Sequence, residues 1–316
     1  MYDLIGDIHG HADELVELLS KLGYREHSGV YQHPSRQVIF CGDFIDRGTQ
    51  IRDVLQIARS MVEAGTARAV MGNHEYNAIT FHTLRPEQTD QYFRRHNEHN
   101  TRQHQATLNQ LSPDEIKSAV QWFMSLPVAL DLGQLRVVHA CWDPLSIGKM
   151  SEALVNFGGF TTDFLLRSTD LRHPLFHAVE RVLKGPELKL PEGCYVVDKE
   201  GGQRNRIRIR WFDPPDQHTL ASYSLPAADD PELSQQPVRG SFRAVPYDRT
   251  HPPVFIGHYW MPELTPRPLA DNVACLDYSV AIGGCLCAYR FDGESRLSEE
   301  RFVTVASRRK SGTMSR

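Results

Sequence analysis

Residues 38–48 read VIFCGDFIDRG, and this stretch decides the fold. Its first four residues form an apolar run typical of a buried strand, and a glycine–aspartate pair ends the run. A helical pattern follows, because apolar side chains recur at three- and four-residue spacing over residues 51–62. The same order of apolar run, glycine and polar loop occurs at residues 2–7 and 68–73. Strands that alternate with helices predict βαβ units and an α/β fold.

The composition of the 316-residue chain excludes several classes of protein. Hydrophobic residues make up 41% and charged residues 23%, and 35 Lys and Arg against 39 Asp and Glu give a formal net charge of −4. A dedicated nucleic-acid binder would show a basic excess, and no apolar run approaches the ~20 residues that span a membrane. The six cysteines form no CxxC pair, so neither a disulfide framework nor a zinc ribbon is expected. With an acid at position 3 and no basic leader, we expect a cytoplasmic protein with no stable nucleic-acid partner and no membrane partner.

The middle of the chain combines a clear helix start with a polar stretch. Residues 112–115 read SPDE, a capping box with proline at the first helical position, and predict a helix that runs to about Ser125. Residues 127–139 predict a hairpin-like pair of strands. Residues 82–110 are polar and rich in histidine, which fits either a solvated helical excursion or a flap over the active site. We expect surface positions for His82, His96, His99 and His104.

Residues 146–253 differ in character from the segments before them. Arginine occupies every second position over residues 204–210, which predicts a strand with one cationic face. Eight of the 19 prolines fall between residues 214 and 253, which is loop composition. Strand patterns resume at residues 254–258, 273–277, 286–291 and 301–305. We interpret residues 1–306 as a single domain with an insertion at about 146–253, and residues 307–316 as a disordered basic tail.

Polar side chains follow five of the predicted strands, at the point where each strand ends. GDIHG occupies residues 6–10, GDFIDRG residues 42–48 and GNHE residues 72–75, and single histidines follow two later strands. Because the loops at the carboxyl ends of the strands of an open α/β sheet line one crevice, we expect these side chains to converge. The candidate ligands are Asp7, His9, Asp43, Asn73, His139 and His258.

These six side chains predict a centre that holds two metal ions. They offer oxygen and nitrogen donors without a thiolate, which suits Mn, Fe, Zn or similar divalent ions. Six ligands are too many for one four-coordinate ion that keeps an open position, but they fit two ions that share a carboxylate. Paired ions ~3.5–4 Å apart promote in-line displacement at phosphorus.

The motifs resemble the calcineurin-like metallophosphoesterase superfamily. More narrowly, they are similar to its phosphoprotein-phosphatase branch, which includes bacterial and phage protein phosphatases and symmetrical dinucleoside tetraphosphatases. GDxHG, GDxxDRG, GNHE and two separated histidines occur in the order of that branch, and the resemblance covers about residues 3–143 and 254–291. It implies a four-layer α/β/β/α metallophosphoesterase sandwich with two facing mixed β-sheets.

The resemblance also implies which residues hold each metal ion. Asp7 and His9 would hold the first ion, and Asp43 would bridge both. The ligands of the second ion would be Asn73, His139 and His258. We expect the two divalent ions to be Mn²⁺, with Fe or Zn as alternatives.

Three further residues acquire catalytic roles from the resemblance. His74 would donate a proton to the leaving group and would be oriented by Asp46, because a carboxylate on one ring nitrogen maintains the charge and orientation of an imidazole. Arg47 would grip the phosphoryl group, since its planar fork matches two phosphate oxygens. The nucleophile would be a metal-bridging hydroxide.

The family usually has a second phosphate-binding arginine between its last two histidine ligands. The arginine-rich segment lies in that interval, so the candidates for substrate binding are Arg204, Arg208 and Arg210. A solvated strand face explains the same pattern equally well.

Three functional hypotheses follow. The first is a dinuclear-metal-dependent phosphohydrolase that acts on phosphomonoesters, including phosphoserine or phosphothreonine in protein. The alternative is a symmetrical dinucleoside tetraphosphate hydrolase, and the third is a non-catalytic metal-binding scaffold. The expected partner is therefore a phosphorylated small molecule, a nucleotide or a phosphoprotein.

Overall fold

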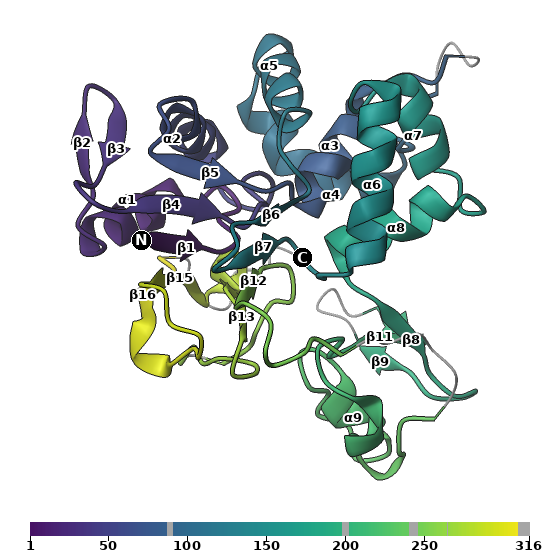
Figure 1. The fold of residues 1–316 in the computed structure, drawn as a ribbon. Helices are drawn as coiled ribbons and strands as arrows, with labels where there is room; N and C mark the ends of the chain where they lie inside the picture. The colour runs from purple at the N-terminus through teal and green to yellow at the C-terminus, as the bar shows by residue number, and fades with distance from the viewer. Residues whose placement is uncertain (87–90, 198–201, 240–245, 264, 309–316) are drawn as a thin grey trace.

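The computed structural model describes residues 1–86, 91–197, 202–239, 246–263 and 265–308 (Figure 1). Its larger sheet has strand β1 (Tyr2–Ile5) at the centre, hydrogen-bonded in parallel to β4 (Gln37–Phe40) and antiparallel to β15 (Cys285–Phe291). The outer strands are β5 (Ala67–Ala69) beside β4, and β14 (Asp277–Tyr278) and β16 (Phe302–Ala306) beside β15. The first strand therefore depends on a strand from the other end of the chain.

The second sheet has the order β13 (Val273–Cys275), β12 (Val254–Ile256), β7 (Arg136–Val138) and β6 (Ala129–Asp131). Strand β12 is parallel to both of its neighbours, and β6 is antiparallel to β7. The two sheets face each other across a shared apolar core, in which the Phe255 ring centroid lies 5.1 Å from that of Tyr289 and 5.9 Å from that of Phe291. The predicted α/β fold with two mixed sheets is confirmed.

Helices cover the larger sheet and lead into the middle of the chain. Helix α1 (Ala12–Lys21) packs on β15 and β16, and α2 (Ile51–Glu63) packs on β5. Next come α3 (Asn73–His82), α4 (Glu98–Gln110) and α5 (Pro113–Phe123). Helix α5 begins as predicted, because Ser112 Oγ accepts the Glu115 N–H while Glu115 Oε2 accepts the Ser112 N–H. A small hairpin of β2 (Arg25–His27) and β3 (Val30–Gln32) was not predicted.

The described residues between 144 and 239 form a lobe at one side of the two sheets (Figure 1), and its helices contribute to the main apolar core. Helices α6 (Pro144–Phe157), α7 (Thr162–Ser168) and α8 (Pro174–Lys184) pack on one another. Beyond them lie short elements: β8 (Glu187–Lys189), β9 (Val196–Val197), β10 (Gln203–Arg204), β11 (Arg206–Arg208) and α9 (Leu220–Tyr223). These elements enclose a second, smaller apolar cluster that includes Ile207, Ile209 and Tyr223. The division into one domain with an insertion stays our interpretation of this arrangement.

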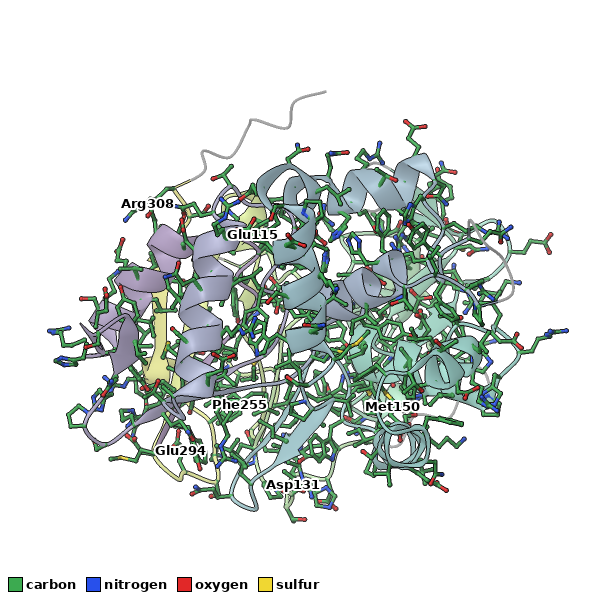
Figure 2. All side chains as sticks on the ribbon, turned by 90° about the horizontal axis from the view of Figure 1, so that it is seen from above. Glu115, Asp131, Met150, Phe255, Glu294 and Arg308 are labelled. Atoms are coloured by element: carbon green, nitrogen blue, oxygen red, sulfur yellow. The ribbon has the colours of Figure 1, made fainter. Side chains whose placement is uncertain are left out.

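Two predictions about the ends of elements need adjustment. The regular strand predicted over residues 204–210 is broken into β10 and β11 and ends at Arg208. Arg308, which is labelled in Figure 2, belongs to the predicted tail. It pairs with Asp13 and Glu17 of α1, while residues 309–316 lie outside the described residues. In the part of the chain that the structure describes, no helix combines the length and the apolar character needed to cross a membrane.

Candidate metal centre and active site

The side chains predicted as metal ligands lie together at one edge of the two sheets. Asp7 and Asp43 follow neighbouring parallel strands, and their loops are joined by backbone hydrogen bonds from Ile8 and His9 to the Asp43 carbonyl, at 3.1 and 2.9 Å. His139 and His258 follow the parallel strands β7 and β12 of the facing sheet. Burial is nearly complete for all six predicted ligands: Asp7, His9, Asp43, Asn73, His139 and His258.

Asp43 lies between two groups of donor atoms. Its Oδ2 is 3.6 Å from His9 Nε2, 3.9 Å from His74 Nε2 and 3.4 Å from His139 Nε2. Burial alone would raise the pKa of Asp43, but the surrounding imidazoles hold it well below its usual range. A buried carboxylate that stays ionised between two sets of nitrogen donors is suited to bridge two cations.

The second group of donor atoms surrounds the amide oxygen of Asn73. This Oδ1 lies 3.0 Å from His139 Nε2 and 2.6 Å from His258 Nδ1. The ligand atoms of Asp43, His139 and His258 lie within 4.8 Å of one another, and so do those of His9, Asp43 and His74. The geometry therefore places His74 beside the first group, although the sequence predicts that this histidine is a proton donor.

Two buried atoms are suited to a bound metal ion. Among the described residues, Asp7 Oδ1 and His9 Nε2 are buried at the centre without a hydrogen-bond partner. His9 and His139 donate from Nδ1 to the carbonyls of Ile45 and Cys41, at 2.8 and 2.7 Å. This second contact fixes the tautomer, so that each Nε2 presents a lone pair to the centre. Burial, followed by the nearby His74, lowers the pKa of His9 to about 3, which keeps the ring neutral and able to coordinate.

The backbone around the centre is held in an uncommon conformation. Six non-glycine residues of the site have left-handed φ angles, between 47° and 71°: His9, Asp43, Asp46, Arg47, His258 and Trp260. Such residues cost of order 1–3 kcal/mol each and persist where the surroundings over-determine them. Their concentration here indicates a site whose side-chain directions matter more than local stability.

Glu75 holds the loop that carries Asp43, a role that sequence reasoning missed. Its carboxylate accepts backbone hydrogens from Asp43 and Phe44 at 2.8 and 2.9 Å, and from Gly72 at 3.0 Å. Burial and the Asp43 charge raise the pKa of Glu75 to about 7. The signal was available, because Glu75 is the last residue of GNHE.

Asp46 and His74 form the predicted pair. His74 Nδ1 lies 2.5 Å from Asp46 Oδ2, and both side chains are buried. Burial alone would lower the pKa of His74, but the carboxylates of Asp43 and Asp46 raise it. Because an ionised carboxylate can only accept, the hydrogen on Nδ1 belongs to the imidazole. The opposite nitrogen, Nε2, faces the metal centre, where it can reach a leaving group.

The expectation that His104 lies on the surface is wrong. Helix α4 buries His104 against Asp46, with Nδ1 2.8 Å from Asp46 Oδ1, and Thr107 Oγ1 donates to the same oxygen at 2.5 Å. His96 is exposed, as expected, with its ring centroid 3.8 Å from that of Phe81 and 4.0 Å from that of Tyr92. His104 and Thr107 stand outside every motif, so no local pattern could have identified them.

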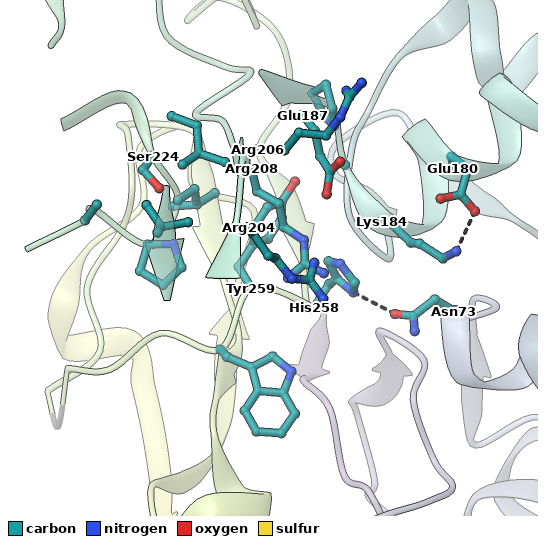
Figure 3. Close-up of a pocket in the computed structure, with 18 of the residues that line it drawn as sticks. Asn73, Glu180, Lys184, Glu187, Arg204, Arg206, Arg208, Ser224, His258 and Tyr259 are labelled. Atoms are coloured by element: carbon teal, nitrogen blue, oxygen red, sulfur yellow. Dashed lines mark hydrogen bonds and ion pairs between the residues drawn. The ribbon is translucent and has the colours of Figure 1, made fainter. Parts of the chain in front are cut away.

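The centre opens into a pocket of about 1280 Å³. Asp43, Asn73, His74 and His258 form its floor, and Arg94 and Gln103 from residues 82–110 line one wall. Those residues therefore border the site, in line with the second of the two alternatives for this stretch. The lobe after residue 143 contributes the opposite wall (Figure 3), which includes Lys184, Glu187, Arg204, Arg206 and Arg208.

The four arginines of residues 204–210 lie in different environments in the structure. Arg204 and Arg208 lie beside His258, as Figure 3 shows, and Arg206 also lines the pocket. Arg210 does not line it: its Nε donates to Asp213 Oδ2 at 2.9 Å, and its Nη2 donates to the Leu269 carbonyl at 3.0 Å. Of the three predicted candidates for substrate binding, Arg210 is therefore the one that lies away from this pocket. Arg47 lines the pocket with its guanidinium 5.2 Å from the Trp260 ring centroid.

Comparison with known proteins gives a family match over more than half of the chain. The sequence model described as calcineurin-like phosphoesterase matches residues 2–178. Two curated relatives are named bis(5'-nucleosyl)-tetraphosphatase PrpE [asymmetrical]. The one from Bacillus subtilis is 34% identical over 163 residues, which is 49% of this chain and 64% of the relative. The one from Halalkalibacterium halodurans is 34% identical over 170 residues, which is 51% of this chain and 66% of the relative. The chain thus spans slightly less than two thirds of each relative.

Solved structures show a weaker likeness. A putative diadenosine tetraphosphatase is 16% identical, with a TM-score of 0.44 over 97% of this chain and 93% of its own. A protein serine/threonine phosphatase from Saccharomyces cerevisiae is 15% identical, with a TM-score of 0.49 over 97% of this chain and 79% of its own.

Proposed function

Because the chain belongs to the calcineurin-like phosphoesterase family, we propose that it is a two-metal hydrolase that cleaves a phosphoanhydride bond of a dinucleoside polyphosphate. The pocket is the observation that carries the choice of substrate. Its volume of about 1280 Å³ exceeds the ~300–1,000 Å³ of ordinary small-molecule sites, and a phosphomonoester would leave most of it unused. The names of the curated relatives support the same class of substrate.

The names of these relatives also change the expected position of the cut. Our sequence-based alternative was a symmetrical hydrolase, which cuts a tetraphosphate at its central anhydride bond into two nucleoside diphosphates. The curated relatives are named asymmetrical. An asymmetrical cut of a four-phosphate chain leaves one phosphate on one product and three on the other. We therefore propose a mononucleotide and a nucleoside triphosphate as products.

The buried donors would hold the two divalent ions in the proposed enzyme. Asp7 and His9 would hold the first ion and Asp43 would lie between both, while the ligands of the second would be Asn73, His139 and His258. We propose Mn²⁺, with Fe and Zn as alternatives, because the donor set is oxygen and nitrogen. When bound, such ions act as Lewis acids on the phosphoryl group and lower the pKa of water.

The charged side chains around the centre would bind and orient the phosphates. Arg47 and Arg208 would grip the phosphoryl group under attack, since a guanidinium forms two parallel hydrogen bonds with phosphate oxygens. After burial, the main cause that lowers the pKa of His258 is the charge of Arg208, which supports a position of this guanidinium next to the metal centre. Arg204 and Arg206 would contact phosphates farther along the chain.

His74 would supply the proton that the departing phosphate oxygen needs. Its Nδ1–H is held by Asp46 at 2.5 Å, so the ring can carry a second hydrogen on Nε2 and give it up toward the centre. A positioned general acid contributes typically ~10²–10⁴-fold to the rate.

Product analysis tests the proposal directly. Purified protein loaded with Mn²⁺ would be incubated with diadenosine tetraphosphate, with a phosphoserine peptide and with p-nitrophenyl phosphate. We expect ATP and AMP from the first, in equal amounts and at a rate well above that of phosphate release from the peptide. Two ADP would restore the symmetrical alternative, and turnover of the peptide alone would restore the phosphomonoesterase. If metal-loaded protein leaves all three untouched, the non-catalytic scaffold becomes the better explanation.

A further inference from the structure

Both oxygens of the Asp46 carboxylate are engaged, and they face different parts of the molecule. Oδ2 holds His74 Nδ1 at 2.5 Å, while Oδ1 accepts from His104 Nδ1 at 2.8 Å and from Thr107 Oγ1 at 2.5 Å. These four side chains are buried. Two of the three donors to the carboxylate therefore come from α4, outside the motif residues.

Helix α4 also holds the backbone of Asp46. The Asp46 N–H donates to Thr107 Oγ1 at 3.1 Å, and Asp46 itself has a left-handed φ of 69°. An aspartate in this conformation is not fixed by its own backbone preferences. Its side-chain direction depends on the contacts that surround it, and α4 makes those contacts on the side away from His74.

The orientation of the His104 ring is set by a further histidine. His104 Nε2 lies 3.0 Å from Nε2 of His82, the last residue of α3. Two ring nitrogens at this distance share one hydrogen, and either arrangement of that hydrogen keeps the His104 ring in the same plane. Since an ionised carboxylate can only accept, the hydrogen on His104 Nδ1 points at Asp46. Burial, followed by the neighbouring rings of His104 and His96, lowers the pKa of His82 to about 4, so that His82 is neutral at neutral pH.

We propose that His104 is a positioning residue for the proton donor: by holding Asp46 Oδ1, it fixes the rotation of the carboxylate whose other oxygen directs His74. This inference rests on the proposed role of His74. Without His104 the carboxylate gains rotational freedom, and His74 Nε2 loses its fixed direction toward the leaving group. A misplacement of about 1 Å in a catalytic constellation costs up to about 10²-fold in rate.

Three variants separate the hydrogen bond from the volume of the ring. His104→Ala removes both. His104→Asn keeps an amide nitrogen close to the position of Nδ1, whereas His104→Gln carries its amide nitrogen farther out, near the position of Nε2. His96→Asn serves as the matched control, because His96 lies in the same segment and packs on Phe81 and Tyr92. Metal content and melting temperature would be measured for each variant.

The kinetic readout is the dependence of kcat on the leaving group. Loss of proton donation slows phenyl phosphate, whose leaving group is basic, far more than 2,4-dinitrophenyl phosphate, whose leaving group departs without a proton. We expect His104→Ala to lower kcat by about 10–100-fold with phenyl phosphate and to change it little with the dinitrophenyl ester, with KM unchanged. His104→Asn should recover most of the loss, and His104→Gln should not. An equal fall with both esters would show a merely structural role and overturn the proposal.

A second readout does not depend on activity. The Nδ1–H of His74, hydrogen-bonded to Asp46 at 2.5 Å, should give a low-field proton resonance that is assigned by its loss in His74→Asn. We expect His104→Ala to shift or broaden this resonance, and His104→Asn and His96→Asn to leave it in place. If wild type cleaves neither ester nor a dinucleotide, the proposed function fails, and this resonance alone decides the positioning role. A resonance unchanged in His104→Ala would exclude that role.

Discussion

Gly257 makes the proposed first metal position sensitive to a single methyl group. A Cβ on this glycine would lie 2.0 Å from Asp7 Oδ1, the buried oxygen that is available to a metal ion. The φ angle of Gly257 is not left-handed, so alanine is permitted by the backbone and the conflict is with the ligand alone. The lack of a side chain at this position is therefore required by the candidate metal centre and not by the backbone conformation.

Gly257→Ala is therefore expected to weaken metal binding without unfolding the protein. The methyl group displaces Asp7 Oδ1, so the bound metal content should fall and activity should fall with it, as measured by elemental analysis and Mn²⁺ titration. Gly148→Ala is the control, because its Cβ meets nothing within 4 Å and alanine favours the helix in which it lies. Full metal content in Gly257→Ala would contradict the assignment of Asp7.

His74→Asn should separate proton donation from metal binding. The backbone N–H of residue 74 still donates to Asp43 Oδ1 at 3.0 Å, so the metal ligands keep their support. We expect both ions to be retained and kcat to fall by roughly 10²–10⁴-fold. Asp43→Asn should lose metal as well as activity. Equal metal loss in the two variants would mean that His74 acts as a ligand of the first ion.

Among the secondary-structure elements, strand β11 takes part both in packing and in the pocket. Ile207 belongs to the small apolar cluster and, like the flanking Arg206 and Arg208, borders the pocket. Figure 3 shows Arg208 beside His258 and Arg206 directed away from it. One strand therefore offers two arginines at different distances from the metal centre.

Arg208→Ala is expected to lower kcat/KM for diadenosine tetraphosphate by roughly 10–100-fold, because a hydrogen bond to a charged group contributes about 1.5–3 kcal/mol. Arg206→Ala should cost less, since it would lose a contact remote from the phosphorus under attack. The measurement is steady-state kinetics on both variants at equal metal content. A larger loss for Arg206→Ala would reverse the order of the two phosphate contacts.

The contact between His82 of α3 and His104 of α4 should make the free energy of unfolding depend on pH. The pKa of His82 is lowered to about 4 in the folded protein, against about 6.5 in an unfolded chain. The unfolded chain therefore binds a proton that the folded protein excludes between these values. Neutral His82 therefore contributes to the free energy of unfolding fully above pH 6.5, and this contribution is lost as the pH falls toward 4.

His82→Gln should accordingly lose less stability on acidification than wild type. Urea midpoints would be compared at pH 7.5 and pH 5 on protein freed of metal by a chelator, so that metal release does not contribute. Parallel losses in the two proteins would show that another group carries the pH dependence.

At the scale of the whole molecule, the two ends of β1 have different surroundings: a buried ion-pair cluster lies at its start and the candidate metal centre at its end. Before the strand ends at the metal centre, Asp3 forms a buried cluster in which its carboxylate accepts from Arg36 Nε at 2.9 Å and from Tyr24 Oη at 3.0 Å, and pairs with Arg290 at 3.2 Å. The cluster ties β15 and the segments around β2 and β4 to the first strand.

Asp3→Ala is expected to destabilise the protein by about 3–5 kcal/mol, because it removes the buried carboxylate that Arg36 and Arg290 share and leaves Arg36 with Asp292 as its remaining acidic partner. Asp13→Ala, which removes an exposed partner of Arg308, should cost no more than about 1 kcal/mol. Denaturant unfolding gives both values. Metal affinity and kcat of the folded Asp3→Ala protein should match wild type, and a loss of either would show that the two ends of β1 are coupled.

The features that could be predicted from the sequence are those that depend on local patterns of residues. The α/β fold and the convergence of Asp7, Asp43 and His258 follow from strand ends and parallel pairing, which are visible in the chain. The burial of His104 was missed, because it results from the packing of α4 on a distant loop. The position of Arg210 away from the pocket could not be foreseen for a different reason. A two-residue period continues in the sequence after the strand has ended, and Arg210 forms an ion pair with Asp213, three residues later.

The contact between Asp7 and His258 has a consequence for the order in which the protein is made. The His258 N–H donates to Asp7 Oδ2 across 251 residues, and β1 needs β15 as its second neighbour. At about 5–20 residues per second, the ribosome takes roughly 10–50 s to cover that interval. During this time Asp7 lacks its hydrogen-bond donor, because His258 has not yet been synthesised. In the proposed enzyme, metal loading would thus be a late event in the life of the nascent chain, and a chain that ends before residue 258 would lack one donor of the centre.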